Sequence, residues 1–283
     1  MIALGPADPR YPERLLDLPQ PPEPLWVDGD VPALRSRTVS IVGTRRMTPY
    51  GARVARDLAV ACAGAGIVVV SGLAQGVDSA AHAGALEAKG KTIAVIGAGL
   101  EAYLAEIRGR RRTLAHAIRA NGALVSEFPP DAPAQKWTFL KRNATIAALG
   151  EITVVVEAPA GSGALITAAE ARRLRRPVYA VPGPIGAGAS AGTNALIANR
   201  RARALTGGAM LLSAFGVLAG VRPMTDGDDF DARVLDALAA SPTDPDALAR
   251  RLGLPHARLA VVLARLVVRG DVIAAPDGRL ARR

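Results

Sequence analysis

The sequence predicts a doubly wound α/β core with a mostly parallel sheet, followed by a small separate C-terminal unit. Short runs of β-branched residues recur from Val39 onward, and helical stretches rich in Ala, Leu and Arg separate them. Near-continuous apolar strands that alternate with helices are typical of a parallel sheet covered on both faces. The last ~55 residues lack this alternation but are enough for a stable module of their own.

Residues 1–38 form a proline-rich lead-in, predicted to pack on the core through a short helix near Tyr11–Leu16 and an extended segment at Leu25–Val27. The core is expected over residues 39–220. Its predicted strands are Val39–Val42, Ile67–Val70, Thr92–Ile96, Ala123–Val125, Ile152–Val156 and Val178–Val181. Right-handed crossovers place every strand-to-helix loop at one edge of such a sheet, where a ligand is expected.

Residues 221–229 are polar and predict a linker to a C-terminal domain over residues 230–283. Its expected helices are Asp231–Ala240, a second begun by Asp244 and Pro245 and ended by Gly253, and Pro255–Arg269. A hairpin turning at Asp277-Gly278 follows. Three helices and a hairpin are the order of a winged helix-turn-helix. The arginines of the third helix either contact the backbone of a duplex or solvate a helix whose other face is apolar; they are Arg258, Arg265 and Arg269.

The charge balance favours a polyanionic partner. The chain carries 35 Lys and Arg against 25 Asp and Glu, a net charge of +10, and nucleic acid is the first candidate. The alternative is an Arg-rich genome composition. The single cysteine, Cys62, excludes internal disulfides and fits a reducing, cytoplasmic setting. We find neither a signal-peptide pattern nor an apolar run long enough for a membrane span, so no membrane partner is predicted.

The loop after the first core strand reads Gly43-Thr44-Arg45-Arg46 and runs into a helix start at Thr48-Pro49. Such a junction combines backbone N–H groups, a helix N-terminus and guanidinium charge, which together suit a phosphate. No G-x-G-x-x-G follows Gly43, which argues against a dinucleotide cofactor. The alternative is a plain turn with solvated arginines.

The loop after the second strand offers Ser71 and Gly72 as a further wall of the same site, or serves only the turn. Asp78 is placed to cap the next helix, and His82 lies one helical turn further on, where the two side chains could touch. A lone histidine beside one carboxylate is more often structural than catalytic.

Cations and aromatics follow later strands. Lys136, Trp137 and Phe139 precede Lys141-Arg142-Asn143, and this interleaving suits a strand whose bases stack while its phosphates pair. Alternatively, the two aromatics anchor the core. The remaining candidate for phosphate contact is Ser162, which opens another helix. The run of Arg108, Arg110, Arg111 and Arg112 is either a track for the DNA backbone or a solvated face.

Catalytic patterns are missing. The sequence shows neither a Walker A loop nor a recognisable Ser-His-Asp order, and the one cysteine with three histidines makes no familiar zinc spacing. Glu127 and Glu157 each end a strand without forming an evident acid–base pair. We therefore predict no catalytic residue, no metal and no cofactor.

Seven ordered motifs resemble the DprA/Smf family of DNA-processing proteins over most of the chain. They are Val42–Arg45 with Tyr50-Gly51, Ser71–Asp78 with Ala81-His82, Thr92–Gly97, Ser126-Glu127, Arg142-Asn143 with Ile146-Ala147, Val155–Ala158 with Ser162–Thr167, and Ala180–Gly183 with Gly192–Ile197. The resemblance implies an extended Rossmann-like core that binds single-stranded DNA, a homodimer, and a winged helix over 230–283. It also implies a mediator that protects incoming strands and loads RecA recombinase during natural transformation, without catalysis.

The chain departs from the family pattern at three places. Tyr103 is followed by leucine rather than proline, Phe139–Ala144 loses a proline and an arginine, and Asn199-Arg200-Arg201 stands where Asp-Gly-Ala is usual. These departures concern the DNA-holding cations and the dimer and RecA surfaces rather than the fold.

Two enzyme classes are the rivals. The broad Rossmann-like group includes nucleotide-cleaving phosphoribohydrolases with a Pro-Gly-Gly-x-Gly-Thr-x-x-Glu motif, but Ala160–Thr167 has Ser-Gly for Gly-Thr and lacks the glutamate. A dinucleotide oxidoreductase is disfavoured further by the missing glycine fingerprint.

Overall fold

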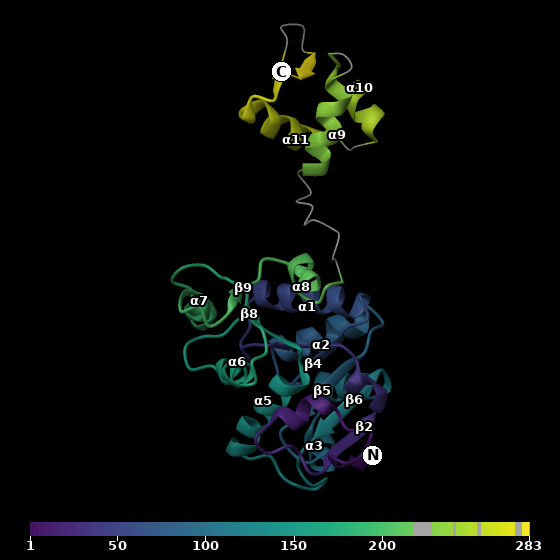
Figure 1. Ribbon diagram of the computed structural model, residues 1–283, viewed down its shortest axis with the longest axis vertical. Helices are drawn as coiled ribbons and strands as arrows, with labels where there is room; N and C mark the ends of the chain where they lie inside the picture. The colour runs from purple at the N-terminus through teal and green to yellow at the C-terminus, as the bar shows by residue number, and fades with distance from the viewer. Residues whose placement is uncertain (218–227, 240–241, 254–255, 275–278, 283) are drawn as a thin grey trace. The chain divides into compact units, whose positions relative to one another are not determined.

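A computed structural model describes residues 1–217, 228–239, 242–253, 256–274 and 279–282. The chain divides into two compact units, Met1–Leu218 and Ala219–Arg283 (Figure 1). The first unit holds a nine-stranded sheet in the order β1-β2-β6-β5-β4-β3-β7-β8-β9. This is the predicted α/β class with a mostly parallel sheet.

Seven neighbouring strands are parallel, and they include all six expected from the sequence. They are β3 (Thr38–Val42), β4 (Val68–Ser71), β5 (Thr92–Ile96), β6 (Gly122–Ser126), β7 (Ile152–Val155), β8 (Val178–Ala180) and β9 (Arg203–Ala204). The chain runs from β3 outward to β6 on one side and then returns to add β7, β8 and β9 on the other. The strand order thus reverses between β3 and β7, and this is where a doubly wound fold opens a crevice.

The lead-in extends the sheet. β2 (Leu25–Gly29) pairs antiparallel with β6, and β1 (Ile2–Leu4) pairs antiparallel with β2. The expected short helix is the 3₁₀ segment η1 (Glu13–Asp17), and a second one, η2 (Val31–Arg35), follows. The sequence indicates an extended segment at Leu25–Val27, but its antiparallel pairing appears only in the structure.

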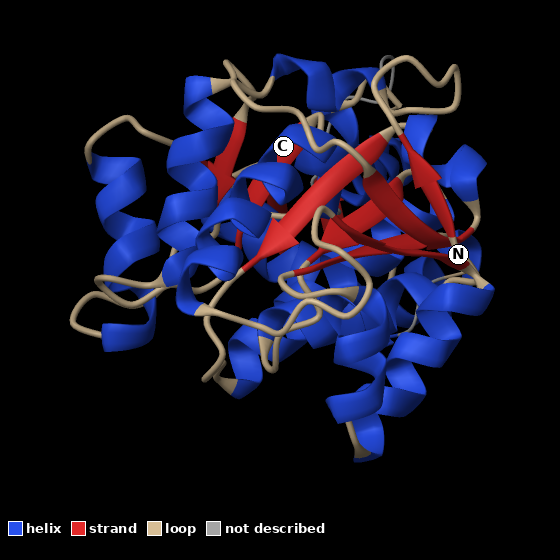
Figure 2. Cartoon of the chain, turned by 90° about the horizontal axis from the view of Figure 1, so that it is seen from below, coloured by secondary structure: helices blue, strands red, loops and turns tan. Residues whose placement is uncertain are grey.

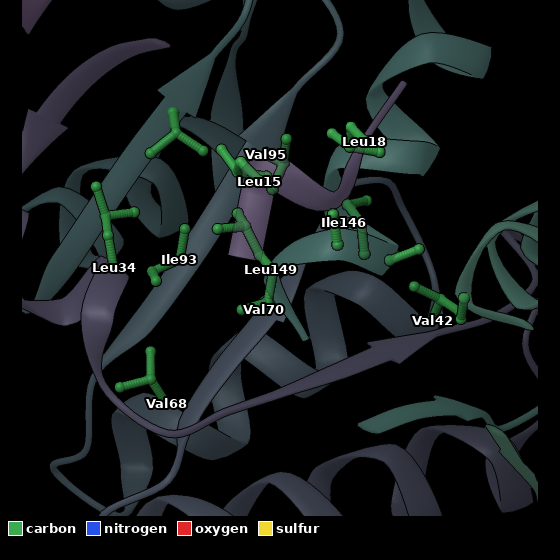
Figure 3. Packing of buried hydrophobic residues seen from close by; sticks show 14 of the residues in the cluster. Leu15, Leu18, Leu34, Val42, Val68, Val70, Ile93, Val95, Ile146 and Leu149 are labelled. Atoms are coloured by element: carbon green, nitrogen blue, oxygen red, sulfur yellow. The ribbon is translucent and has the colours of Figure 1, made fainter. Parts of the chain in front are cut away.

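Helices cover both faces of the sheet (Figure 2). On one face α1 (Pro49–Gly64) packs against α2 (Val77–Glu87) and α8 (Gly208–Ala214) (Figure 1). The other face is covered by α5 (Lys136–Leu149), α6 (Gly163–Arg173) and the lead-in. Figure 3 shows Leu15, Ile146 and Leu149 packed on strand residues such as Val70 and Val95. The other helices of this unit are α3 (Leu100–Glu106), α4 (Gly109–Ala120), α7 (Ala191–Ala198) and the 3₁₀ turn η3 (Gly188–Ser190).

Strand residues alternate between the two cores. Val39 and Ile41 are buried on the α1–α2 side, whereas Val42 is buried on the α5–α6 side. Because helices bury both faces of the sheet, the parallel strands are continuous apolar runs in the sequence.

The C-terminal unit contains α9 (Asp228–Ala239), α10 (Pro245–Leu252), α11 (His256–Arg269) and the antiparallel pair β10 (Val272–Ala274) and β11 (Leu280–Arg282). This is the predicted winged-helix order.

Asp244 caps α10 by accepting from the N–H of Asp246 at 2.8 Å, and Gly253 ends this helix in the left-handed region. The helix α9 begins at Asp228, so the last two residues of the expected linker are helical. The rest of that linker, Pro255 and the Asp277-Gly278 turn lie outside the described residues.

In α11 the expected apolar stripe is buried, with Leu259, Val262 and Leu266 at most 4% exposed. The side chains of Arg258, Arg265 and Arg269 lie outside the described part, so their predicted role stays a prediction.

Candidate functional site

A pocket of about 450 Å³ opens at the reversal point between β3 and β7. We call it the switch-point pocket. The loops after β3 and β7 and one side of α5 line it, as expected for the carboxyl edge of this sheet. Its lining includes Gly43, Thr44, Arg45, Arg46, Asp78, Phe139, Arg142, Asn143 and Ser162.

The loop after β3 is fixed by backbone contacts and presents two cations. The N–H of Thr44 donates to the Glu157 carbonyl at 2.7 Å, and the Thr44 hydroxyl accepts from the N–H of Arg46 at 3.1 Å. A side chain at Gly43 would meet Val77 Cγ2 at 2.6 Å, so glycine is required for this close approach. Arg45 and Arg46 are exposed on the pocket wall.

The N-terminus of α1 is occupied by a carboxylate of the protein itself. Thr48 is the N-cap of α1, and its N–H and hydroxyl donate to the Glu157 carboxylate at 2.9 and 2.6 Å. Glu157 is only 2% exposed. The expectation that this helix start is open to a phosphate is therefore wrong, because an internal anion already uses it.

The helix start that faces the pocket belongs to α6. Ser162 is its N-cap, with the hydroxyl accepting from the N–H of Ala164 at 3.4 Å, and Asn143 Nδ2 donates to the Gly163 carbonyl at 3.4 Å. Both Ser162 and Asn143 belong to the pocket lining. A helix N-terminus carries partial positive charge and favours an anion at this wall.

Arg142 lies at the base of the pocket with 6% of its surface exposed. Its Nη1 donates to the Val95 carbonyl at 3.3 Å, while its Nε finds no hydrogen-bond partner among the described residues. Burial lowers the pKa of this guanidinium, and the charge of Asp78 opposes that shift. Arg142 is thus a buried cation with hydrogen-bonding capacity left over, which suits an incoming anion.

Asp78 is the carboxylate that faces Arg142. It accepts from the N–H groups of Gly72 at 3.2 Å and Ala74 at 3.4 Å, so it holds the loop after β4 rather than the start of α2. Burial raises its pKa, and Arg142 acts in the opposite direction. A Cβ at Gly72 would overlap the Arg142 guanidinium, which explains glycine at this position.

A second hollow of about 490 Å³ continues the first. We call it the Tyr103 pocket. It shares Arg45, Phe139 and Arg142 with the switch-point pocket, and Gly72, Arg108 and Arg111 add to its lining. The Phe139 ring lines both hollows, with the guanidinium carbons of Arg45 and Arg142 at 5.7 and 5.9 Å from its centroid. Both contacts are within cation–π range.

The Tyr103 hydroxyl is buried beside the side chain of Arg111. Burial raises its pKa, and the charge of Arg111 opposes this. Nearby, Arg108 turns back and donates to the carbonyls of Ala105 and Ile107. The candidate site therefore continues past Phe139 into the Tyr103 pocket, which is lined by a tyrosine hydroxyl and by exposed arginines.

Several predicted site residues lie elsewhere. Ser71 is fully buried, and its hydroxyl donates to the Ile41 carbonyl at 2.6 Å. Lys141 pairs with Glu127 at 3.1 Å and lies over Phe128, away from both hollows. The residues that are exposed but line neither hollow are Lys136, Arg110 and Arg112. Residues 141–143 lie in the second turn of α5 rather than at its start, because the helix begins at Lys136.

His82 does not touch Asp78. It is fully buried, and its Nδ1 lies 2.7 Å from the Thr92 hydroxyl, which itself donates to the Val69 carbonyl at 2.7 Å. Nδ1 is therefore the protonated nitrogen, and His82 tethers α2 to β5. This is the structural role that the sequence favours.

Of the two aromatic residues of α5, Trp137 is not a core anchor, whereas Phe139 is half-buried and packs against Gly97. Trp137 is 54% exposed and meets Phe128 edge-to-face at 5.5 Å, while Leu140 is 53% exposed beside the switch-point pocket. Tyr103, which lines the second hollow, is not among the site residues predicted from the sequence, whereas Phe139 is considered there as either a stacking surface or a core anchor. The alternation of aromatics with Lys136, Lys141 and Arg142 is the signal that points to Phe139.

These features define a doubly wound α/β protein with a basic, aromatic-edged pocket at its topological switch point. The family comparison makes the assignment specific. A family model described as DNA recombination-mediator protein A matches residues 3–216, and one for the DprA winged helix domain matches residues 222–278. The chain belongs to the DprA/Smf family of DNA-processing proteins.

Relatives support this assignment. The chain is 42% identical to Protein Smf of Escherichia coli over 195 residues, which cover 69% of this chain and 52% of that protein. It is 36% identical to the DNA processing protein DprA of Streptococcus pneumoniae over 205 residues, covering 72% and 71%. The chain spans about half the length of several of these relatives, including those from E. coli and Mycobacterium tuberculosis.

Two solved structures share the fold. The S. pneumoniae DprA structure aligns with a TM-score of 0.69 at 34% identity, covering 75% of this chain and 73% of that one. A Helicobacter pylori DNA processing protein A, whose single-stranded DNA binding mode has been studied structurally, aligns with a TM-score of 0.66 at 30% identity, covering 72% and 92%. Within the described residues, no helix is long and apolar enough to cross a membrane.

Proposed function

We propose that this chain is a single-stranded-DNA-binding recombination mediator that grips the sugar–phosphate backbone across the switch-point and Tyr103 pockets. The observation that carries the proposal is the placement of Arg45 and Arg142 on the Phe139 ring, where the two hollows join. The two guanidinium groups beside the ring can pair with phosphates, and the ring adds apolar surface.

Exposed apolar groups favour a single strand over a duplex. Trp137 and Leu140 leave about half of their surface accessible on α5, the helix that also carries Arg142. Bases of a single strand can stack on such side chains, whereas a duplex keeps its base faces covered. The DNA-binding mode of the H. pylori relative is consistent with this choice.

Binding, rather than catalysis, is the role we propose for the pocket. Its buried carboxylate, Asp78, accepts two backbone N–H groups and faces Arg142, and Glu157 is used by Thr48. Both carboxylates thus have structural partners. Incubation with nucleoside monophosphates tests the rival phosphoribohydrolase activity: we expect no free base, and its release in proportion to protein would contradict the proposal.

Membership in the family leads us to propose the wider role as well. The protein would act in the cytoplasm as a homodimer, protect incoming single strands and load RecA recombinase onto them during natural transformation. A pull-down with RecA in the presence of single-stranded DNA, together with light scattering of the free protein, tests the two partners.

The decisive experiment compares Arg45→Ala with Arg53→Ala. Arg53 is an exposed residue of α1 that lines neither hollow, so it controls for removal of one charge. Fluorescence anisotropy with a labelled oligothymidine is measured across salt concentrations. We expect Arg45→Ala to cost about 1.5–3 kcal/mol and to reduce the salt slope by about 0.7 for each phosphate that is no longer neutralised. Equal effects of the two substitutions would show that the pocket is misassigned.

A further inference from the structure

A second basic groove lies at the opposite edge of the sheet from the switch-point pocket. We call it the amino-edge groove; it measures about 680 Å³. Its wall is built by the C-terminal ends of α6 and α7 and by the turns that lead into β8 and β9. Because these strands are parallel, their amino ends meet at one edge. The groove is lined by Arg172, Arg175, Arg176, Arg200, Arg201 and Arg203.

The lining of the groove carries more positive charge than nearby carboxylates and helix dipoles neutralise. Within the described chain the lining contains no acidic residue, and one carboxylate from outside it, Asp17, pairs with Arg176 at 2.5 Å. The C-termini of α6 and α7 add about half a negative charge each. Against six guanidinium groups, this leaves a surplus of about four positive charges.

Two of the arginines hold backbone conformations that favour glycine. Arg175 has φ of 56° and Arg200 of 55°. Each follows a helix in the same motif: the N–H of Arg176 bonds to the Ala171 carbonyl, and that of Arg201 to the Leu196 carbonyl. The residue before each of these donors is usually glycine, since a side chain there is strained. Arg175 and Arg200 therefore place cations in the groove at two positions where the backbone conformation favours glycine.

Lys89 provides the comparison. It ends α2 with φ of 55°, and the next residue, Gly90, donates to the Ala85 carbonyl in the same motif. A cation at such a site also complements the helix dipole. Helix capping alone thus accounts for one cation per helix end, but not for six that converge on one groove.

The lining offers charge without stacking surfaces. Its aromatic residue, Tyr179, is 4% exposed, and Val178 is 6% exposed. Bases therefore find no ring to stack on among the described lining residues, in contrast to the Phe139 and Trp137 region. Five of the arginines are exposed, and guanidinium groups fork onto phosphate oxygens.

We propose that the amino-edge groove binds the phosphodiester backbone of a second nucleic-acid segment, independently of the switch-point pocket. Because the groove recognises only the charge of the phosphates, it binds duplex DNA as well as a single strand. The same molecule then holds two segments at opposite edges of one sheet.

The test uses Arg175→Gly/Arg200→Gly in the full chain. Glycine at these two positions removes both charges and adopts the positive φ without strain, so the melting temperature should stay equal or rise. The matched control is Lys89→Gly/Arg173→Ala, which removes one cation from the same type of helix end and an exposed arginine absent from the groove lining.

Binding of a labelled duplex is followed by anisotropy without competing single-stranded DNA, and Arg45→Ala reports any contribution of the single-strand site to duplex binding. We expect the glycine pair to weaken duplex binding at least tenfold and to lower the salt slope by about 1.8, since each phosphate contributes about 0.9. The control and Arg45→Ala should bind the duplex as the wild type does. Wild-type duplex binding by the glycine pair, or an equal weakening in the control, would overturn the proposal while leaving the single-strand site untouched.

Discussion

Buried His82 should make the stability of the first unit pH-dependent. The side chain is fully buried, its Nδ1–H donates to Thr92, and its Nε2 has no acceptor within the described residues. Protonation would place a charge on that nitrogen in a dry site that also faces the positive charge of Arg142. Burial, with Arg142 second, lowers the pKa of His82 to about 3.

The sign follows from comparing folded and unfolded states. The pKa of histidine in the unfolded chain is near 6.5, so below this pH the unfolded chain binds a proton that the folded chain does not bind. The stabilising contribution is complete above pH ~6.5 and is lost as the pH falls toward 3. Each pH unit corresponds to about 1.36 kcal/mol, so lowering the pH from 6.5 to 5 should remove about 2 kcal/mol.

Urea denaturation at several pH values checks this. We compare wild type with His82→Asn, whose amide does not titrate, and with His116→Asn, which removes an exposed imidazole. His82→Asn should be less stable at pH 7 but should lose about 2 kcal/mol less than wild type between pH 6.5 and 5. Parallel pH profiles for wild type and His82→Asn would refute the buried neutral imidazole.

Three further substitutions test other parts of the structure. Gly72→Ala should displace the Arg142 guanidinium and weaken single-strand binding about tenfold or more, measured by anisotropy beside thermal melting to confirm folding. Trp137→Ala should cost about 1–3 kcal/mol of single-strand affinity but leave duplex binding unchanged, and an equal weakening of both would contradict stacking. Asp244→Ala should cost the C-terminal unit about 1 kcal/mol by removing the α10 cap, and an unchanged urea midpoint for that unit would contradict it.

The strands, and the edge of the sheet at which the candidate site residues meet, could be predicted because both follow from local pattern. Each parallel strand is a continuous β-branched run, and crossover handedness then brings Arg45, Arg142 and Ser162 to one edge. The antiparallel β1–β2 extension could not be predicted in this way. It depends on pairing Trp26 with Ser126, about a hundred residues along the chain, and three-residue β1 carries little pattern of its own.

Side-chain partners account for the other differences. Ser71 is a strand residue whose hydroxyl points to Ile41 on the neighbouring strand, and Lys141 is drawn to Glu127 from another loop. The same holds for Glu157, which reaches Thr48 from the far side of the reversal point. Composition and spacing cannot reveal such pairs. The amino-edge groove escapes sequence inspection as well, because its arginines come from two turns about 25 residues apart.

Both borders of the nine-stranded sheet are short. β1 contributes three residues and β9 only two. A border this brief exposes few unpaired amide and carbonyl groups, so it gives another chain little template for extending the sheet. The borders of the sheet therefore disfavour strand pairing between copies of the protein, so a high protein concentration need not seed β-aggregates.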